Sequence, residues 1–195
     1  MSGTTIVLLI LAAVVIYGII LYNKLIGLRN RVKNGFAQID VQLTRRHDLI
    51  PGLIEAVKGY MKHEKDTLEA VIQARNQAVS GLQAAASDPS NAEAMSVLSG
   101  AEQMLSGVLG RLFALAEAYP ELKANENMLE FQEQLTTTEN KVAFSRQAFN
   151  DAVMSYNNGI EMFPGSLIAG WFSFAPATFL EIESEDKRKV PEVKF

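Results

Sequence analysis

The first stretch of the chain is apolar on every side of a helix. The run from Ile6 to Tyr22 holds no charged side chain, and the first charge comes at Lys24. With its polar flanks it gives about 20 residues, enough for a helix to cross a hydrocarbon core of ~30 Å. We therefore predict a transmembrane anchor over residues 1–23. The side chains expected to face lipid are Ile6, Leu8, Leu9, Val14, Ile16, Ile19 and Tyr22.

The flanks of this stretch decide between an anchor and a cleaved signal peptide, and they suggest an orientation. Residues 1–5 hold no Lys or Arg and no clear small-residue cleavage site follows, which favours a retained anchor. Six basic residues follow the span, with Asp40 the only acid among them: Lys24, Arg29, Arg31, Lys33, Arg45 and Arg46. The positive-inside rule then predicts an N-terminus outside and a cytoplasmic remainder. The first four bases either touch anionic headgroups or form a solvated helix face.

Beyond Lys24, apolar residues recur at steps of three and four, the spacing of a buried helix face. Val32, Phe36, Ile39 and Leu43 begin this stripe. Four helices are predicted, over about 24–47, 49–82, 91–118 and from Asn125 or Asn127 to about 159. Short turns between them indicate an all-α fold, an antiparallel four-helix bundle over residues 24–161 behind the anchor.

Pro51 leaves a second topology open. Asp48 can cap a new helix, and proline is tolerated in a first helical turn or at a kink. However, the apolar spacing continues almost in phase across Pro51, through Ile50 and Ile54. The first two helices can therefore be one long helix kinked at Pro51, giving three helices. With four helices the last one returns to the membrane, and with three it points away.

Three glycines interrupt the third predicted helix, namely Gly100, Gly107 and Gly110. Each costs about 1 kcal/mol relative to alanine in a helix. Small residues at such places usually allow a neighbouring helix to approach closely, so we expect close packing there.

Residues 162–180 form an apolar, aromatic segment interrupted by proline and glycine. It is too short to span a bilayer, yet too apolar to leave in water. The candidate interface residues are Phe163, Leu167, Ile168, Trp171, Phe172 and Phe174. They can fold back on the bundle, lie in the lipid interface, or contact another protomer or partner. Residues 181–195 form a charged tail, interpreted as a solvated extension.

Arg45, Arg46 and Asp48 form a candidate polar contact. If the chain turns near Pro51, these residues lie at the end of the bundle far from the membrane, beside the turn at Asn125–Asn127. The two turns then cap one another or form a shared contact surface.

The residue types offer little chemistry. The chain has 195 residues and no cysteine, which excludes disulfides, thiolate metal sites and thiol nucleophiles. His63-Glu64 lacks the second histidine of a zinc protease helix, and no nucleophile is tied to His47-Asp48. The net charge of −4 argues against a nucleic-acid partner. We predict no enzyme activity, cofactor or metal.

Several motifs in combination give a resemblance over nearly the whole chain. They are Arg45–Pro51 (RRHDLIP), Val57–Tyr60 (VKGY), His63–Lys65, Leu68–Val71, Ala74-Arg75, Tyr119–Asn127 (YPELKANEN) and Phe163–Ala169. With the uncharged span they resemble the LemA family of bacterial membrane proteins. Gly52 and Gly165 stand where that family usually has asparagine, at positions interpreted as turns.

The resemblance implies an anchored antiparallel four-helix bundle in the bacterial inner membrane, but no catalytic residues. A loose association of some members with membrane metalloproteases of the HtpX type suggests a protease or another membrane protein as partner. We therefore expect a non-enzymatic, self-assembling scaffold or adaptor, whose partners are the lipid bilayer and its own copies. The alternatives are a membrane-remodelling or envelope-stress protein and a regulator of a membrane metalloprotease.

Overall fold

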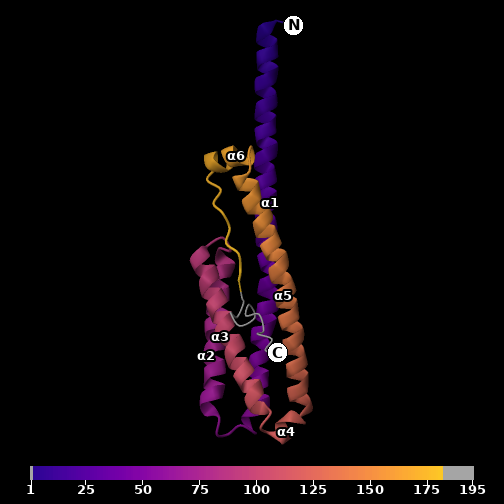
Figure 1. Cartoon of the computed structure of the whole chain (residues 1–195), viewed down its shortest axis with the longest axis vertical. Helices are drawn as coiled ribbons and strands as arrows, with labels where there is room; N and C mark the ends of the chain where they lie inside the picture. The colour runs from indigo at the N-terminus through magenta and orange to yellow at the C-terminus, as the bar shows by residue number, and fades with distance from the viewer. Residues whose placement is uncertain (1, 182–195) are drawn as a thin grey trace, which may run out of the picture.

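The computed structural model describes residues 2–181, which form six helices and no strand within that range. The charged tail from residue 182 onward lies outside the described residues. Four long helices run antiparallel, and Figure 1 shows one of them extending far beyond the other three. The helices are α1 (Gly3–Lys58), α2 (Lys65–Ser87), α3 (Ala92–Ala116), α4 (Pro120–Lys123), α5 (Glu126–Glu161) and α6 (Gly165–Trp171). The predicted four-helix bundle behind a long N-terminal apolar helix is confirmed.

The boundary between the first two predicted helices was wrong. α1 continues through Pro51 to Lys58, about 84 Å at 1.5 Å per residue, and the chain turns at residues 59–64 instead. Proline removes the N–H that would bond to the carbonyl four residues earlier. Arg75 of α2 compensates, because its Nε donates to the carbonyl oxygen of His47 at 3.2 Å.

Gly52 is therefore no turn residue. It lies inside α1 and faces α5, where a Cβ atom would come within 2.7 Å of the Phe131 ring. The later helix starts are closer to expectation, since Asn91 and Asn125 cap α3 and α5 by accepting from the amides of Ala94 and Met128.

The core is assembled from two pairs of helices. α1 packs along α5 and α2 along α3, while α1 also contacts α2. The stripe of Val32, Phe36, Ile39 and Leu43 is buried as predicted. Because α5 runs back along α1, it ends beside the exposed apolar part of α1, and α6 lies there as well (Figure 1).

The three glycines of α3 do not make the close helix packing that we expected. A Cβ atom at Gly100, Gly107 or Gly110 would meet no atom within 4 Å. The close approach between α2 and α3 is made at Gly81 instead, whose Cβ would lie 3.3 Å from the Cα of Leu98.

Candidate functional site

The exposed apolar part of α1 ends where the bundle begins. Side chains from Ile6 to Ile20 are exposed, Leu21 and Tyr22 are half-buried, and Leu25 is the first buried residue. An 18-residue window of α1 has a mean hydropathy of 2.8 and no buried share, so length and composition allow this helix to cross a membrane. A core helix of a soluble protein would be largely covered, whereas the residues that the structure describes bury none of this 18-residue window.

Helix α6 lies against α1 at this boundary. Ile168 is buried and lies within reach of Gly18, where a Cβ atom would be 3.9 Å from its Cδ1. The ring of Tyr22 lies 4.7 Å from that of Phe172 and 5.8 Å from that of Phe174, measured between centroids. Arg29 lies over the Phe174 ring at 5.4 Å.

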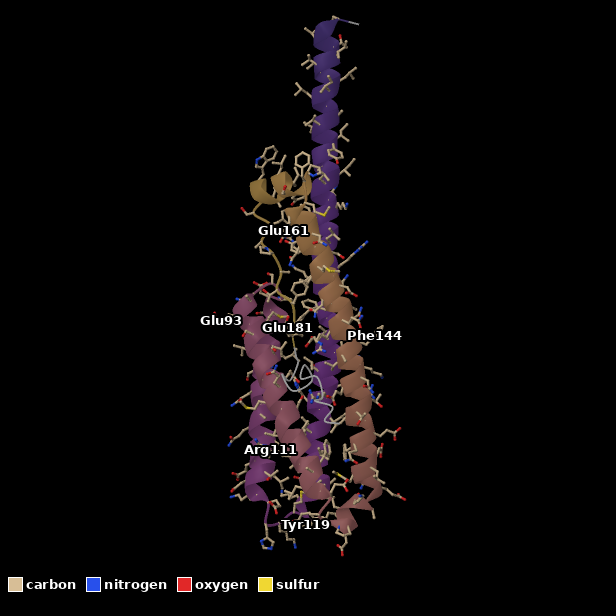
Figure 2. The ribbon with its side chains drawn as sticks, viewed as in Figure 1. Glu93, Arg111, Tyr119, Phe144, Glu161 and Glu181 are labelled. Atoms are coloured by element: carbon tan, nitrogen blue, oxygen red, sulfur yellow. The ribbon has the colours of Figure 1, made fainter. Side chains whose placement is uncertain are left out.

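The six predicted interface residues separate into two groups. Ile168 is buried and Phe174 half-buried, so they belong to the bundle. The other four are exposed, with fractions of 79% for Phe163, 52% for Leu167, 78% for Trp171 and 57% for Phe172, whose ring also packs on Tyr22. We call these four residues, three aromatic and one leucine, the aromatic collar. Phe163 lies just before α6, Leu167 and Trp171 belong to it, and Phe172 follows it, and α6 itself lies beside α1 (Figure 2).

The collar is held to α5 by a close approach of two glycines. The α-carbon of Gly165 faces the carbonyl oxygen of Gly159 so closely that a Cβ atom would collide with it. Lys24 of α1 lies at the same level and lines a cavity of about 290 Å³ with Asn158, Phe163 and other residues. A cationic group is thus placed next to the apolar collar.

Beyond α6 the chain runs back as an extended segment, held by two asparagines of α5. The amide of Asn157 donates to the carbonyl oxygen of Ala177 and accepts from its N–H, both at 2.9 Å. Asn150 does the same with Leu180, at 3.2 and 3.0 Å. Seven helical residues rise about 10.5 Å and three extended residues about 10 Å, so the two clamps match in spacing.

Tyr156 completes the attachment of this segment. Its hydroxyl donates to the carbonyl oxygen of Ala175 at 2.8 Å, and burial raises the pKa of Tyr156. Ser99 of α3 donates to the carbonyl oxygen of Glu181, so the segment lies between α3 and α5. Sequence reasoning missed these clamps, and the repeat of asparagine at a spacing of seven was the available signal.

The predicted polar contact takes a different form. Arg45 and Asp48 are exposed, and Arg46 lies in the middle of α1 rather than at a turn. Arg46 donates to Glu102 Oε2 at 3.0 Å and to the Ser106 hydroxyl at 2.8 Å. The other carboxylate oxygen of Glu102 is 2.7 Å from His47 Nε2.

This buried charge cluster is well shielded from solvent. Glu102 is fully buried, His47 is 2% exposed and Arg46 6% exposed. The sequence analysis missed Glu102, although it follows Leu98 by four residues and precedes Leu105 by three, which is the spacing of the buried stripe. At the end of the bundle far from the apolar segment of α1, Asn125 bonds instead to the Tyr60 hydroxyl at 3.1 Å.

The second histidine considered in the sequence, His63, lies in a turn whose contacts stabilise the fold. His63 is exposed in the turn before α2, and its neighbour Glu64 accepts from the Tyr119 hydroxyl at 3.1 Å. This bond raises the pKa of Tyr119. Across residues 2–181, no group of three or more His, Asp or Glu side chains is arranged to hold a metal ion.

Comparison with known proteins identifies the family. Residues 35–195 match the family model described as the LemA family. The chain is also 22% identical over 147 residues to Protein LemA of Metamycoplasma hominis, a match that covers 75% of this chain and 63% of that protein. The match therefore spans less than two thirds of the curated relative's length. The apolar helix α1 and the bundle behind it fit a membrane-associated protein of this kind, and the chain belongs to the LemA family.

Proposed function

We propose that the protein is a non-enzymatic, single-pass membrane scaffold or adaptor that assembles with its own copies. In this proposal α1 crosses the bacterial inner membrane with its N-terminus outside, and the bundle stands in the cytoplasm. The basic residues behind the apolar span, Lys24 and Arg29 among them, support this orientation by the positive-inside rule.

The observation that carries the proposal is the position of the aromatic collar. Four large exposed side chains surround α6 where the apolar span of α1 ends. Tryptophan and other aromatic residues are favoured at the level of lipid headgroups, and contiguous apolar exposure marks an interface. A transmembrane helix with a second, interfacial contact is held at a defined angle and depth.

A defined angle and depth suit a scaffold. Every copy anchored in this way presents the sides of its bundle at one height above the membrane. Lys24 lies beside the collar and can meet anionic headgroups, a contact of about 1 kcal/mol for each basic residue near the surface. The bundle itself supplies long helical faces for contacts with neighbours.

The single tryptophan of the chain, Trp171, is a native probe of this contact. In vesicles of zwitterionic and anionic lipid, brominated acyl chains should quench the fluorescence of the full chain, with the strongest effect from bromines near the headgroups. A matched control moves the probe, as Trp171→Phe with Phe144→Trp, and should escape quenching because residue 144 lies 17 residues, or about 25 Å, before the end of α5 that adjoins the collar. Unquenched Trp171 would contradict the membrane contact of the collar.

The assembly part of the proposal has its own test. Native membranes treated with an amine-reactive cross-linker, followed by mass measurement of the extracted complex, should give oligomers of this chain or a stoichiometric complex with a partner. Monomers alone would contradict the scaffold.

A membrane-remodelling role is the second candidate, and the same collar favours it. Phe163, Leu167, Trp171 and Phe172 can enter the headgroup region as a wedge. The full chain should then deform vesicles or release their contents, and the double substitution Trp171→Glu and Phe172→Glu should abolish this. Intact vesicles at high protein density would leave the scaffold as the better account.

A further inference from the structure

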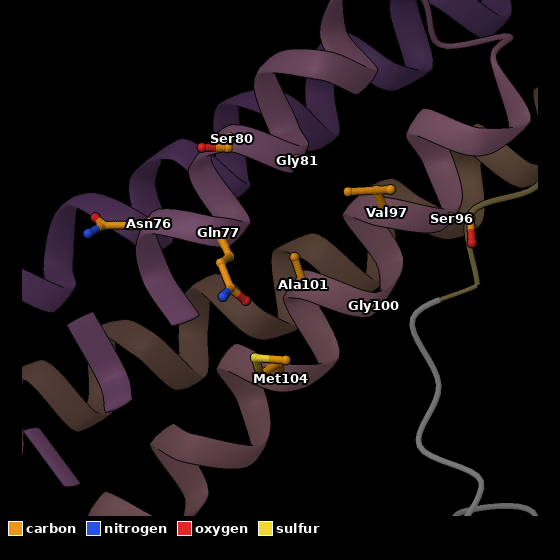
Figure 3. Close-up of a pocket in the computed structure, with 9 residues that line it drawn as sticks. All are labelled: Asn76, Gln77, Ser80, Gly81, Ser96, Val97, Gly100, Ala101 and Met104. Atoms are coloured by element: carbon orange, nitrogen blue, oxygen red, sulfur yellow. The ribbon is translucent and has the colours of Figure 1, made fainter. Parts of the chain in front are cut away.

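A shallow groove lies on the outer side of the α2–α3 pair (Figure 3). Its volume is about 640 Å³, and its lining residues carry no formal charge. Val97 and Met104 line it with exposed fractions of 55% and 53%, and Gly100 lies between them on the same helix face. An uncharged groove with exposed apolar walls can be covered without desolvating an ion.

Two of the three open glycines of α3, Gly100 and Gly107, lie on this side of the bundle. Gly100 lines the groove, and Gly107 follows it two helical turns later, at the spacing that keeps a residue on one face. Neither would meet an atom within 4 Å if it carried a Cβ. Each weakens α3 by about 1 kcal/mol relative to alanine, and no packing inside the chain requires it. Without a Cβ atom at these two positions, the surface of α3 leaves room for a side chain from another molecule.

A protruding side chain is available on another face of the same molecule. Phe144 of α5 is 75% exposed, the largest such fraction among the large apolar residues of the four long helices. In Figure 2 it points outward from α5, away from the α2–α3 pair. One face of the bundle therefore carries a projecting aromatic ring, and another carries a groove.

The height of Phe144 follows from its neighbours. Phe149 of α5 stacks on Phe36 of α1, with ring centroids 5.9 Å apart. Because α5 runs toward the membrane end, Phe144 lies five residues, or about 7.5 Å, below Phe36.

The height of the groove follows in the same way. Arg46 lies ten residues, or about 15 Å, below Phe36 and bonds to Glu102 of α3. Val97 precedes Glu102 by five residues in a helix that runs away from the membrane end, so it lies about 7.5 Å above Glu102. The upper part of the groove is thus level with Phe144.

We propose that Phe144 of one copy docks into the α2–α3 groove of a second copy. Copies held in one bilayer by the same span stand at the same height, so only surfaces of equal height can meet side by side. The contact joins two different surfaces, so it repeats from copy to copy and forms a ring or a row in the membrane. The inference rests on the proposed scaffold function and names the surfaces that would build it.

The absence of cysteine from the chain makes the test direct. Two full-length chains with different tags are expressed together, one carrying Ser96→Cys beside the groove and the other Ala148→Cys one turn from Phe144. Treatment of native membranes with a short bismaleimide should give a mixed dimer. Each single variant expressed alone should give none, because the contact brings unlike surfaces together.

A matched control tests the height. Ser155→Cys replaces Ala148→Cys on the same exposed face, seven residues or about 10.5 Å nearer the membrane, and should not cross-link to Ser96→Cys. Adding Phe144→Ala should lower the yield of mixed dimer about tenfold or more, as for a central aromatic residue of an interface. Leu129→Ala, which removes another exposed apolar side chain of α5, should leave the yield unchanged.

The outcomes separate the two proposals. Oligomers found by mass measurement without the Ser96–Ala148 cross-link would overturn the docking of Phe144 and leave the scaffold standing. A yield indifferent to Phe144→Ala would overturn it too. Monomers alone would overturn both.

Discussion

At Pro51, the carbonyl of His47 loses its usual donor because proline has no N–H. In most helices such a position kinks or breaks the chain, yet α1 continues for seven residues beyond Pro51. Arg75 reaches across from α2 and donates to that carbonyl. A side chain 28 residues away in the sequence thus replaces a backbone hydrogen bond, and local sequence patterns carry no sign of it.

This substitution of one donor for another predicts energetic coupling between the two residues. Arg75→Ala should destabilise the full chain in detergent by about 1–3 kcal/mol, because a part-buried carbonyl loses its partner. In a Pro51→Ala background the new backbone N–H takes over, so Arg75→Ala should cost less. A double-mutant cycle by chemical denaturation should give a coupling of about 1 kcal/mol. Additive effects would contradict this account of Pro51.

Two tyrosines should lose their hydroxyl proton at a higher pH than an ordinary tyrosine. The pKa of Tyr119 is raised by its bond to Glu64, and that of Tyr156 by burial, so both lie above the usual 10.0. A raised tyrosine pKa means that the neutral form is favoured in the folded chain. The contribution to stability is therefore full below pH 10 and is lost as pH rises through the folded pKa.

Tyrosinate absorbance of the folded chain, followed as pH rises, measures this directly. Tyr119→Phe and Tyr156→Phe should each remove part of the late-rising signal. If either variant removed only early-rising signal, the assigned direction would be wrong.

At the scale of the elements, the buried charge cluster divides the core. One apolar group lies on the side of the exposed apolar part of α1 and reaches Leu43 of α1 and Leu98 of α3, and the other begins at Ile50 and Ala101. Arg46, His47 and Glu102 lie between them. An ionic layer at one level penalises any slip of α3 along α1, since a slip would bury the charges without partners.

Glu102→Ala should therefore destabilise the chain by about 3–5 kcal/mol, because it leaves the guanidinium of Arg46 buried and unpaired. Glu93→Ala, an exposed site on the same helix, should change stability by less than about 0.5 kcal/mol. Adding Arg46→Leu to Glu102→Leu should recover most of the loss relative to Glu102→Leu alone. Thermal unfolding in detergent measures all of these, and a small effect of Glu102→Ala would remove the cluster's structural role.

Helix existence was easier to predict than helix ends. The apolar stripes of α1, α3 and α5 are set by spacing alone, and spacing is visible in the sequence. The turn before α2 was misplaced because Pro51 is a strong local signal, whereas Gly59 and the polar residues that follow are a weak one. The hydrogen bond from Arg75 to the carbonyl oxygen of His47 is a tertiary contact that allows the helix to pass Pro51 and turn at Gly59.

Only the part of the candidate site with an unusual composition could be predicted from the sequence. Residues 162–180 stood out as an apolar segment, but the sequence could not say which members face outward. That division depends on the meeting of Gly165 with Gly159 and on the packing of Tyr22 against two rings. Glu102, Asn150 and Asn157 were missed because single polar residues within a helix are usually solvated.

On the scale of the whole molecule, the two helix pairs need a link. α1 and α5 form one pair and α2 and α3 the other, joined along α1 and α2, while α3 and α5 make few direct contacts. In the half of the bundle next to the apolar segment of α1, the extended segment after α6 lies between α3 and α5, with Ala177 and Leu180 buried in the core. The segment therefore acts as a wedge that fills one side of the bundle.

The asparagine clamps should control this wedge. Asn150→Ala and Asn157→Ala each leave a backbone N–H and a carbonyl of the segment without partners, a loss of about 1–3 kcal/mol for each buried polar group left unsatisfied. The double variant should speed hydrogen exchange at Ala177 and Leu180 strongly, since these two amides lose their acceptors. Exchange in the half of the bundle far from the apolar segment of α1, around Leu112 and Met128, should stay slow because these residues belong to the other core cluster.

The neighbouring Asn158→Ala provides the matched control, because the side chain of Asn158 is exposed and does not clamp the segment. It should leave exchange at residues 177–180 unchanged. If release of the segment also displaced the collar, quenching of Trp171 by lipid would fall together with the protection of residues 177–180. Unchanged quenching would mean that α6 holds its place through Gly165, Ile168 and Tyr22 alone. If exchange at residues 177–180 were unaffected in the double variant, the two asparagines would not be what fastens the wedge.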